Sequence, residues 1–281
     1  MTFQKISWRN LAILAGIVIC LIANRSSVLA QGDAPSAEPG VHPLDKPLQW
    51  ARDGLQRIDK STKDYSCTLI KRERIKGELS SHEFIFTKVR HEPFSVYMYF
   101  LKPNAKKGNE CIYVEGGNEG KLWAIAGSGF KRRLGVVSLG VDSASAMEGN
   151  RYPVTMTGFR VLVERLIEMG ETDKQYGECE VKYLKNAKIN GRVCTCIQVT
   201  HPKRRKQFAY HIARIFLDDE LQIPIRLEAY EWPSEKGGKP LLVEEYTYVN
   251  VKLNNGYDDL DFDIRNEKYH FISNKTKKNN R

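Results

Sequence analysis

Residues 83–101, EFIFTKVRHEPFSVYMYFL, contain two apolar runs separated by a short polar break. Both runs are rich in the aromatic and β-branched residues that favour strands. The break, His91-Glu92-Pro93, is too short for a crossover, so the two runs are expected to pair as antiparallel strands. Both faces of each run are apolar, whereas a sheet with one solvated face would alternate. This sheet therefore needs an apolar partner on each side.

The same two-residue period recurs on both sides of this stretch. Segments rich in glycine or asparagine, such as 116–120 and Asn190-Gly191, indicate tight hairpins between the runs. Short connections require antiparallel pairing, so one large curved antiparallel sheet in an α+β fold is predicted. The strands are expected at 65–74, 79–90, 94–101, 109–115, 121–126, 178–187, 192–201, 208–217, 223–231 and 241–253.

Two segments have the helical period instead. Residues 46–60 carry apolar side chains at three- and four-residue spacing, and Pro47 suits a first helical turn. Residues 157–169 form a second amphipathic segment, which Gly170 is expected to end. Between the strands and this helix, residues 127–156 are rich in glycine and serine and have no sustained period. A long irregular segment of this kind is typical of a lid or binding loop.

The N-terminus has the features of an export signal. Lys5 and Arg9 precede the apolar run 11–23, and small residues follow at 28–30. The run is shorter than the roughly 20 residues that span a bilayer. We therefore predict a signal peptide over 1–30, cut after Ala30, and a protein exported to the periplasm or cell envelope. Residues 31–44 are expected to form a flexible leader.

The net charge of +10 is concentrated at the two ends of the chain. Residues 1–30 carry three cations and no acid, and residues 272–281 carry four cations and no acid, which leaves +3 between them. A nucleic-acid partner is therefore not expected. The tail 272–281 is interpreted as a disordered solvated end, with contact to an anionic membrane surface as the alternative.

No catalytic, metal or cofactor motif is present. The chain lacks a His-Glu-x-x-His motif, a Gly-x-Ser-x-Gly elbow and a phosphate-binding loop. Glu244 and Glu245 adjoin on a strand, so they point to opposite faces and cannot act together on one substrate atom. We expect no enzyme activity, although a hydrolase assembled from distant residues is a third hypothesis. The cysteines beyond residue 30 are expected to be small buried side chains, with a disulfide as the alternative: Cys67, Cys111, Cys179, Cys194 and Cys196.

Short motifs add a family resemblance. Ile112-Tyr113-Val114-Glu115-Gly116-Gly117, Ile223-Pro224-Ile225-Arg226 and Asp261-Phe262 follow one another in an order that resembles the periplasmic lipoprotein-sorting carriers LolA and LolB. The stretch 150–155, with the helix after it, resembles an uncharacterised branch of exported domains in that superfamily. The resemblance covers about residues 45–265. It implies a single domain over 45–271, a half-open β-barrel of about 10–11 strands, and an N-terminal helix and mid-chain helix or lid that plug it. It also implies an apolar cavity for acyl chains.

The resemblance and the doubly apolar strands favour a non-enzymatic carrier or binder of lipid or lipidated protein. A cell-envelope scaffold is the alternative, in which the two helices fill the sheet and leave no cavity. Arg151 is a candidate lid latch, with a structural salt bridge as the other interpretation. The candidate cavity residues are Phe84, Phe86, Val96, Met98, Phe100, Trp123, Ile215 and Leu227. Their common face is an assumption, because a shift of one residue reverses every side chain.

Overall fold

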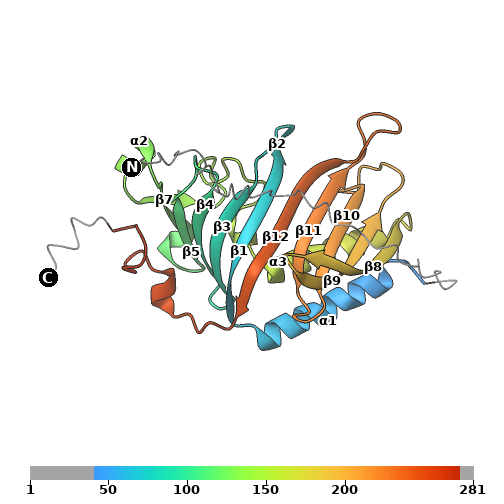
Figure 1. The fold of residues 1–281 in the computed structure, drawn as a ribbon, viewed down its shortest axis with the longest axis horizontal. Coiled ribbons are helices and arrows are strands. Elements are labelled where there is room, and N and C mark those ends of the chain that lie inside the picture. The colour runs from blue at the N-terminus through green and yellow to red at the C-terminus, as the bar shows by residue number, and fades with distance from the viewer. Residues whose placement is uncertain (1–40, 273–281) are drawn as a thin grey trace, which may run out of the picture.

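The computed structural model describes residues 41–272, and these contain a 12-stranded antiparallel sheet (Figure 1). The strand order is β7-β6-β5-β4-β3-β1-β12-β11-β10-β9-β8, with the short β2 beside β1. The edge strands β7 (Val137–Gly140) and β8 (Glu180–Ile189) each pair on one side only, so the sheet is open. The expected α+β fold with a large curved antiparallel sheet is confirmed. The signal peptide, most of the leader and nearly all of the tail lie outside the described residues.

The chain builds the sheet from its centre outward. The first strand, β1 (Asp64–Ile75), pairs with the last, β12 (Leu241–Leu253), and the two halves of the sheet extend from this pair. One half continues through β3 (Glu83–Arg90), β4 (Ser95–Lys102), β5 (Glu110–Val114) and β6 (Lys121–Ile125), and β2 covers Glu78–Leu79. The other half contains β11 (Pro224–Glu231), β10 (Ile212–Asp218) and β9 (Arg192–Thr200).

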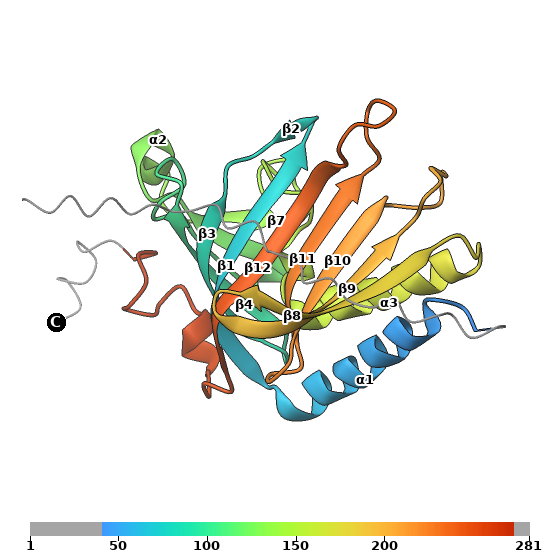
Figure 2. The same cartoon turned by 45° about the vertical axis from the view of Figure 1, so that its right-hand side comes forward.

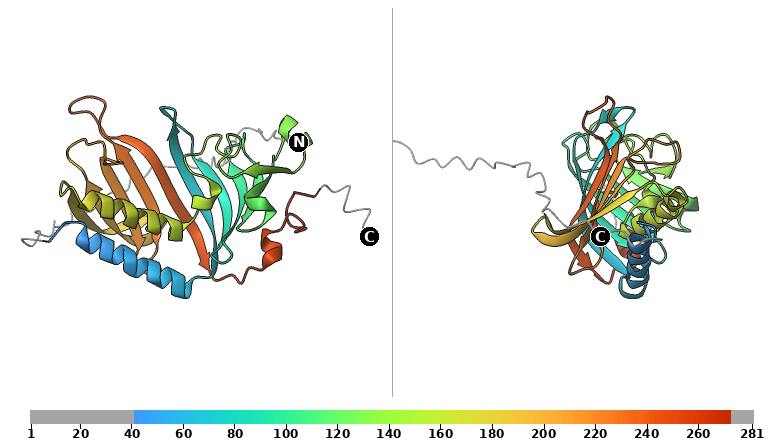
Figure 3. Two further views of the ribbon diagram at one scale, coloured as in Figure 1. Left: turned by 180° about the vertical axis from the view of Figure 1, so that it is seen from behind. Right: turned by 90° about the vertical axis from the view of Figure 1, so that its right-hand side faces the viewer.

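Two helices lie side by side across one face of the second half (Figure 3). They are α1 (Asp45–Ser61) and α3 (Phe159–Lys174), and we call the face that they cover the inner face. The short helix α2 (Gly129–Arg133) lies at the opposite end of the molecule (Figure 2). Short 3-10 helices cover Asn118–Gly120, Val154–Met156 and Asp259–Phe262. The two long helices therefore lie mainly over the C-terminal strands, and the start of α3 also reaches β1, where Phe159 stacks on Tyr65.

Gly170 does not end the second helix as expected, because α3 continues to Lys174. A Cβ at position 170 would lie 2.8 Å from Leu48 Cδ2 on α1. Gly170 is thus needed for the close approach of the two helices. A different glycine, Gly158, is required at the start of α3, directly before Phe159. Its φ is +110°, and a Cβ there would lie 2.5 Å from Tyr65 Oη.

Each face of the sheet has its own apolar cover, as the doubly apolar strands require. On the inner face, α1 and α3 pack against a core that includes Tyr65, Leu69 and Val89. On the outer face of β3–β6, the C-terminal segment 257–271 packs against a second cluster. There Tyr97 stacks on Tyr269 with ring centroids 3.9 Å apart. The chain therefore covers this sheet with helices on one side and with its own irregular C-terminal segment on the other.

The remaining differences from prediction are local. The expected strand 79–90 is divided into β2 and β3, and the strand expected to start at 208 starts at Ile212. The segment 127–156, expected to be irregular, contains the helix α2 and the edge strand β7. The additional strands β2 and β7 raise the number of strands above the expected 10–11. All five cysteines of the described part are free thiols. Between residues 41 and 272, no helix is long and apolar enough to cross a membrane.

Candidate functional site

An apolar pocket lies between α1, α3 and the inner face of β9–β11. Its volume is about 120 Å³. The two helices and the strands each supply aliphatic side chains: Leu48, Ala51, Val163, Leu166, Ile197 and Ile215. The cavity-free alternative expected the helix side chains to fill the whole volume between the helices and the sheet, and they do not. For comparison, an engineered cavity of about 150 Å³ in another protein stays dry and binds benzene.

One part of this pocket is polar. Asp173 of α3 and His201, just after β9, both line it, and His201 Nε2 lies 3.3 Å from Asp173 Oδ2. His201 Nδ1 lies 3.0 Å from the carbonyl oxygen of Tyr210. The pocket thus has aliphatic walls and a small number of polar groups, which is the usual composition of a site that orients a largely apolar ligand.

The helix α1 is a weakly attached wall of the pocket. It contacts α3 through Leu48 and Gly170, and three ion pairs join the two helices: Arg52–Glu171, Asp45–Lys174 and Asp59–Arg160. All six charged side chains are more than one-third exposed. Exposed ion pairs contribute only about 0–1 kcal/mol each. Much of the attachment therefore rests on the apolar contacts that also line the pocket.

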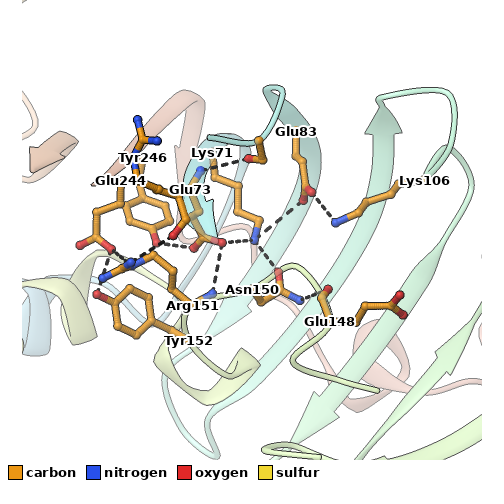
Figure 4. Close-up of polar contacts among 12 residues, drawn as sticks. Lys71, Glu73, Glu83, Lys106, Glu148, Asn150, Arg151, Tyr152, Glu244 and Tyr246 are labelled. Atoms are coloured by element: carbon orange, nitrogen blue, oxygen red, sulfur yellow. Dashed lines mark hydrogen bonds and ion pairs between the residues drawn. The ribbon is translucent and has the colours of Figure 1, made fainter. Parts of the chain in front are cut away.

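Part of the inner face over β1, β3 and β12 is charged rather than apolar (Figure 4). Lys71 and Glu73 of β1 and Glu83 of β3 are all buried. Lys71 Nζ lies 3.1 Å from Glu73 Oε2 and also donates to Asn150 Oδ1, while Lys106 pairs with Glu83. These contacts join the loop 141–153 to the sheet. The cavity hypothesis expected a uniformly apolar inner face, and the structure shows that part of this face is charged.

Glu244 of β12 is the most enclosed charge of this network, with 1% of its side chain exposed. Its Oε2 accepts hydrogen bonds from Arg151 Nε and Tyr152 Oη, both at 2.9 Å, and its Oε1 accepts one from Tyr210 Oη at 2.7 Å. Tyr210 also lines the apolar pocket. This tyrosine consequently separates the charged half of the inner face from the pocket.

The tyrosines of the network stay protonated over the physiological range. Burial, together with the charge of Glu244, raises the pKa of Tyr210 far above its ordinary value. Burial and the charges of Glu244 and Glu73 do the same to the pKa of Tyr246, which donates to Glu73. These hydroxyls act as hydrogen-bond donors to fixed carboxylates. Each carboxylate already has a cationic or hydroxyl partner, so the network is arranged to hold the loop rather than to transfer protons.

The structure does not bring the predicted cavity residues to one place. Ile215 lines the pocket. Val96, Met98, Phe100 and Leu227 belong to the packed core of the inner face. Phe86 and Trp123 pack on the outer face with the C-terminal segment. Phe84 is two residues from Phe86 along β3, so it shares that face, and Lys102 Nζ lies 5.3 Å from its ring centre. These last three side chains therefore face away from the pocket.

Arg151 forms a structural salt bridge. Besides its contact with Glu244, its backbone N–H donates to Glu73 Oε2 at 3.3 Å and its Nη1 donates to the carbonyl oxygen of Arg74 at 3.2 Å. These bonds connect the loop before α3 to β1 and β12. The expected opposite orientation of Glu244 and Glu245 is also confirmed, because Glu245 pairs instead with Arg226 and His82.

Sequence reasoning missed most residues of the pocket and of the network. A signal for the network was present, since Lys71 and Glu73 occupy the same face of β1 as the apolar Tyr65 and Leu69, and Glu83 of β3 lies opposite Lys71. Charges at such positions indicate a buried polar partner. The pocket residues of β9 and β10 carried no comparable signal.

A second hollow, of about 250 Å³, lies on the outer face. It lies between the β5–β6 hairpin and the C-terminal segment, with Ile112, Trp123 and Phe262 as apolar lining and Arg90 and Lys121 as cations. Arg90 Nη1 is held by Asp259 at 2.7 Å. Within residues 41–272, no group of three or more His, Cys, Asp or Glu side chains is arranged to hold a metal ion.

Solved structures that resemble this chain include two mycobacterial proteins and one LolA superfamily protein. Lipoprotein LppX of Mycobacterium tuberculosis is 14% identical, with a TM-score of 0.42, over 76% of this chain and 98% of that one. A LolA superfamily protein from Nitrosomonas europaea is 12% identical, with a TM-score of 0.30, over 76% and 97%. LprF of Mycobacterium bovis is 11% identical, with a TM-score of 0.38, over 78% and 100%. These likenesses concern the fold, and they include the superfamily that the sequence motifs resemble.

Among curated proteins, none matches this sequence. A family model does match, over residues 62–271, and its range extends from just before β1 to the end of the C-terminal segment. The match includes both halves of the sheet, α3 and the loop that carries Arg151. The chain therefore belongs to the DUF1571 family, described as a protein of unknown function.

Proposed function

We propose that this protein is a non-enzymatic carrier or binder of lipid or lipidated protein in the cell envelope. The pocket between α1, α3 and β9–β11 would hold the acyl chain. The observation that carries the proposal is this space of about 120 Å³ with mainly aliphatic walls. The signal-like N-terminus supports export, because a short apolar run follows basic residues there.

The size of the pocket sets what it can accept. Each buried methylene contributes about 0.8 kcal/mol, so a few methylenes give a weak gain that association costs offset. A longer chain needs more room than 120 Å³. We infer that α1 is the wall that moves, since its exposed ion pairs with α3 stabilise the contact only weakly and the rest of the contact is apolar. The acyl chain would then replace Leu48 and its neighbours against the strands.

A space-filling substitution tests the proposal. Ala213 of β10 lines the pocket, and Ala213→Leu places three more carbon atoms in it. We expect the mature protein, purified from the periplasm, to take up a fluorescent fatty acid, and the variant to bind it at least about tenfold more weakly, or about 1.4 kcal/mol. Fluorescence titration and native mass spectrometry of co-purifying lipid provide the two measurements.

The matched control is Val193→Leu, on β9. Val193 is 43% exposed and is not among the pocket residues, so the same kind of enlargement occurs outside the pocket. It should leave binding unchanged. Equal binding by both variants, or no lipid bound by the wild-type protein, would contradict the proposal and favour the cell-envelope scaffold instead.

A further inference from the structure

The short helix α2 carries the most exposed apolar side chains of the described residues. Phe130 is 75% exposed and Leu134, directly after the helix, is 61% exposed. They are four residues apart, so they lie on the same side of one helical turn. An exposed pair of large apolar side chains is unfavourable in water unless another apolar phase covers it.

Three cations lie between these two apolar residues. Lys131 contacts Glu148 at 3.1 Å, but both side chains are more than two-thirds exposed, so the contact is easily exchanged. Arg132 donates to the carbonyl oxygens of Ala126 and His270, at 3.2 and 3.0 Å, which leaves its charge without a carboxylate partner. The sequence from 126 to 141 contains no acidic residue. The surface of α2 is therefore both apolar and positively charged.

The position of α2 suits contact with an extended surface. It projects at the end of the molecule away from α1 and the pocket (Figures 1 and 2). The bond from Arg132 to His270 places the end of the C-terminal segment beside α2. The sequence that follows contributes four more cations, Lys275, Lys277, Lys278 and Arg281, and no acid. The sequence directly after the segment that contacts α2 is therefore strongly basic.

We propose that α2, with Phe130, Leu134 and its three cations, docks this protein on an anionic membrane surface. The apolar pair would enter the boundary between headgroups and acyl chains, while Lys131, Arg132 and Arg133 attract anionic lipid headgroups. The three adjacent cations, in a stretch from 126 to 141 without any acidic residue, favour an anionic lipid surface over a folded protein partner. The inference is independent of the pocket, because the two sites share no residue.

Flotation of the mature protein, from Gln31 to Arg281, with vesicles tests this inference. Vesicles of phosphatidylcholine with phosphatidylglycerol are compared with vesicles of phosphatidylcholine alone. We expect binding to the anionic vesicles, decreasing as salt is added. Phe130→Ser with Leu134→Ser, and separately Lys131→Gln with Arg133→Gln, should each weaken binding at least about fivefold. Arg132 is left unchanged because it holds the C-terminal segment.

The control is Val193→Ser with Leu260→Ser, which removes two exposed apolar side chains elsewhere and should leave binding unchanged. Circular dichroism confirms that each variant folds. The inference is overturned if the wild-type protein ignores anionic vesicles, or if both α2 variants bind as well as the wild type. It is also overturned if removal of residues 273–281 alone accounts for all binding. Sensitivity to Ala213→Leu instead of the α2 variants would assign vesicle binding to the pocket.

Discussion

The two halves of the inner face present different solutions to the same problem of covering a curved sheet. Over one part of β1, β3 and β12, the cover is the loop 141–153, which is joined to the buried Lys71 through Asn150 and to the buried Glu244 through Arg151 and Tyr152. Over β9–β11, the cover is the helix pair α1 and α3, with aliphatic contacts and a remaining space of about 120 Å³. The loop makes directional bonds that fix its position, whereas the helices rest on contacts without direction. The second half is therefore the one in which we propose that a ligand binds.

The difference also concerns what happens when a partner is removed. A buried charge that loses its partner keeps its full desolvation cost. An aliphatic wall that moves away exposes only the surface it covered, and a hydrocarbon ligand can cover it again. Substitutions in the charged part should therefore lower the free energy of unfolding more than substitutions around the pocket.

Arg151→Met should have the largest effect. It leaves Glu244, with 1% of its side chain exposed, without its cation, and the free energy of unfolding should fall by about 3–5 kcal/mol. Urea unfolding followed by circular dichroism measures the loss.

The double variant Arg151→Met with Glu244→Leu sharpens this result. It removes both charges and should be more stable than Arg151→Met alone, because apolar replacements of a buried pair are often tolerated. A double variant that is at least as unstable as the single variant would mean that the loop depends on more than this ion pair.

A matched pair of glycine substitutions tests the packing of the pocket half. Gly170→Val forces a side chain toward Leu48, whose Cδ2 would lie 2.8 Å from the new Cβ, and should destabilise the protein by about 1–3 kcal/mol. Gly54→Ala on α1 meets nothing closer than 3.7 Å and should stabilise it by about 1 kcal/mol through helix propensity. Equal effects of the two, by thermal unfolding, would contradict the close helix contact at Gly170.

The smallest expected effect is a pH dependence at the start of α3. His91 packs edge-on against Tyr65 and Phe159, and burial is the main cause that lowers its pKa from 6.5. The unfolded chain therefore binds a proton more readily than the folded one. The stability associated with this group is complete above pH 6.5 and decreases as the pH falls below that value.

His91→Asn should flatten this dependence. Urea unfolding at pH of about 7.5 and about 5.5 compares the variant with the wild type. An identical loss of stability in both proteins would show that another group, such as His42, whose pKa burial also lowers, is responsible.

The local sequence pattern was sufficient to predict most helices and strands of the fold. The helix expected at 46–60 is observed at Asp45–Ser61, and the strand expected at 241–253 has those bounds. Periodicity identifies such segments because each side chain repeats the environment of its neighbours two, or three to four, residues away. The opposite faces of Glu244 and Glu245 follow from the same rule, which needs no tertiary information.

The face assigned to each strand could not be predicted in this way. Phe86 and Met98 are equally apolar, yet one lies under the C-terminal segment and the other under the helix-side core. The segment that covers Phe86 includes Phe262, Tyr269 and Phe271, which are irregularly spaced and so give no periodic signal. Which face a residue occupies depends on what folds back over it, and that is a long-range contact.

The amino-acid sequence by itself determined the strands, the two main helices and the need for apolar cover on both sides of the sheet, because these depend on residue type and spacing. Only the tertiary structure decided which cover each face received. It placed a charged loop on one half of the inner face and a helix pair with a pocket on the other. The physical reason is that cavities and buried ion pairs arise between segments far apart in the chain, such as Glu244 and Arg151, where no local pattern records the contact.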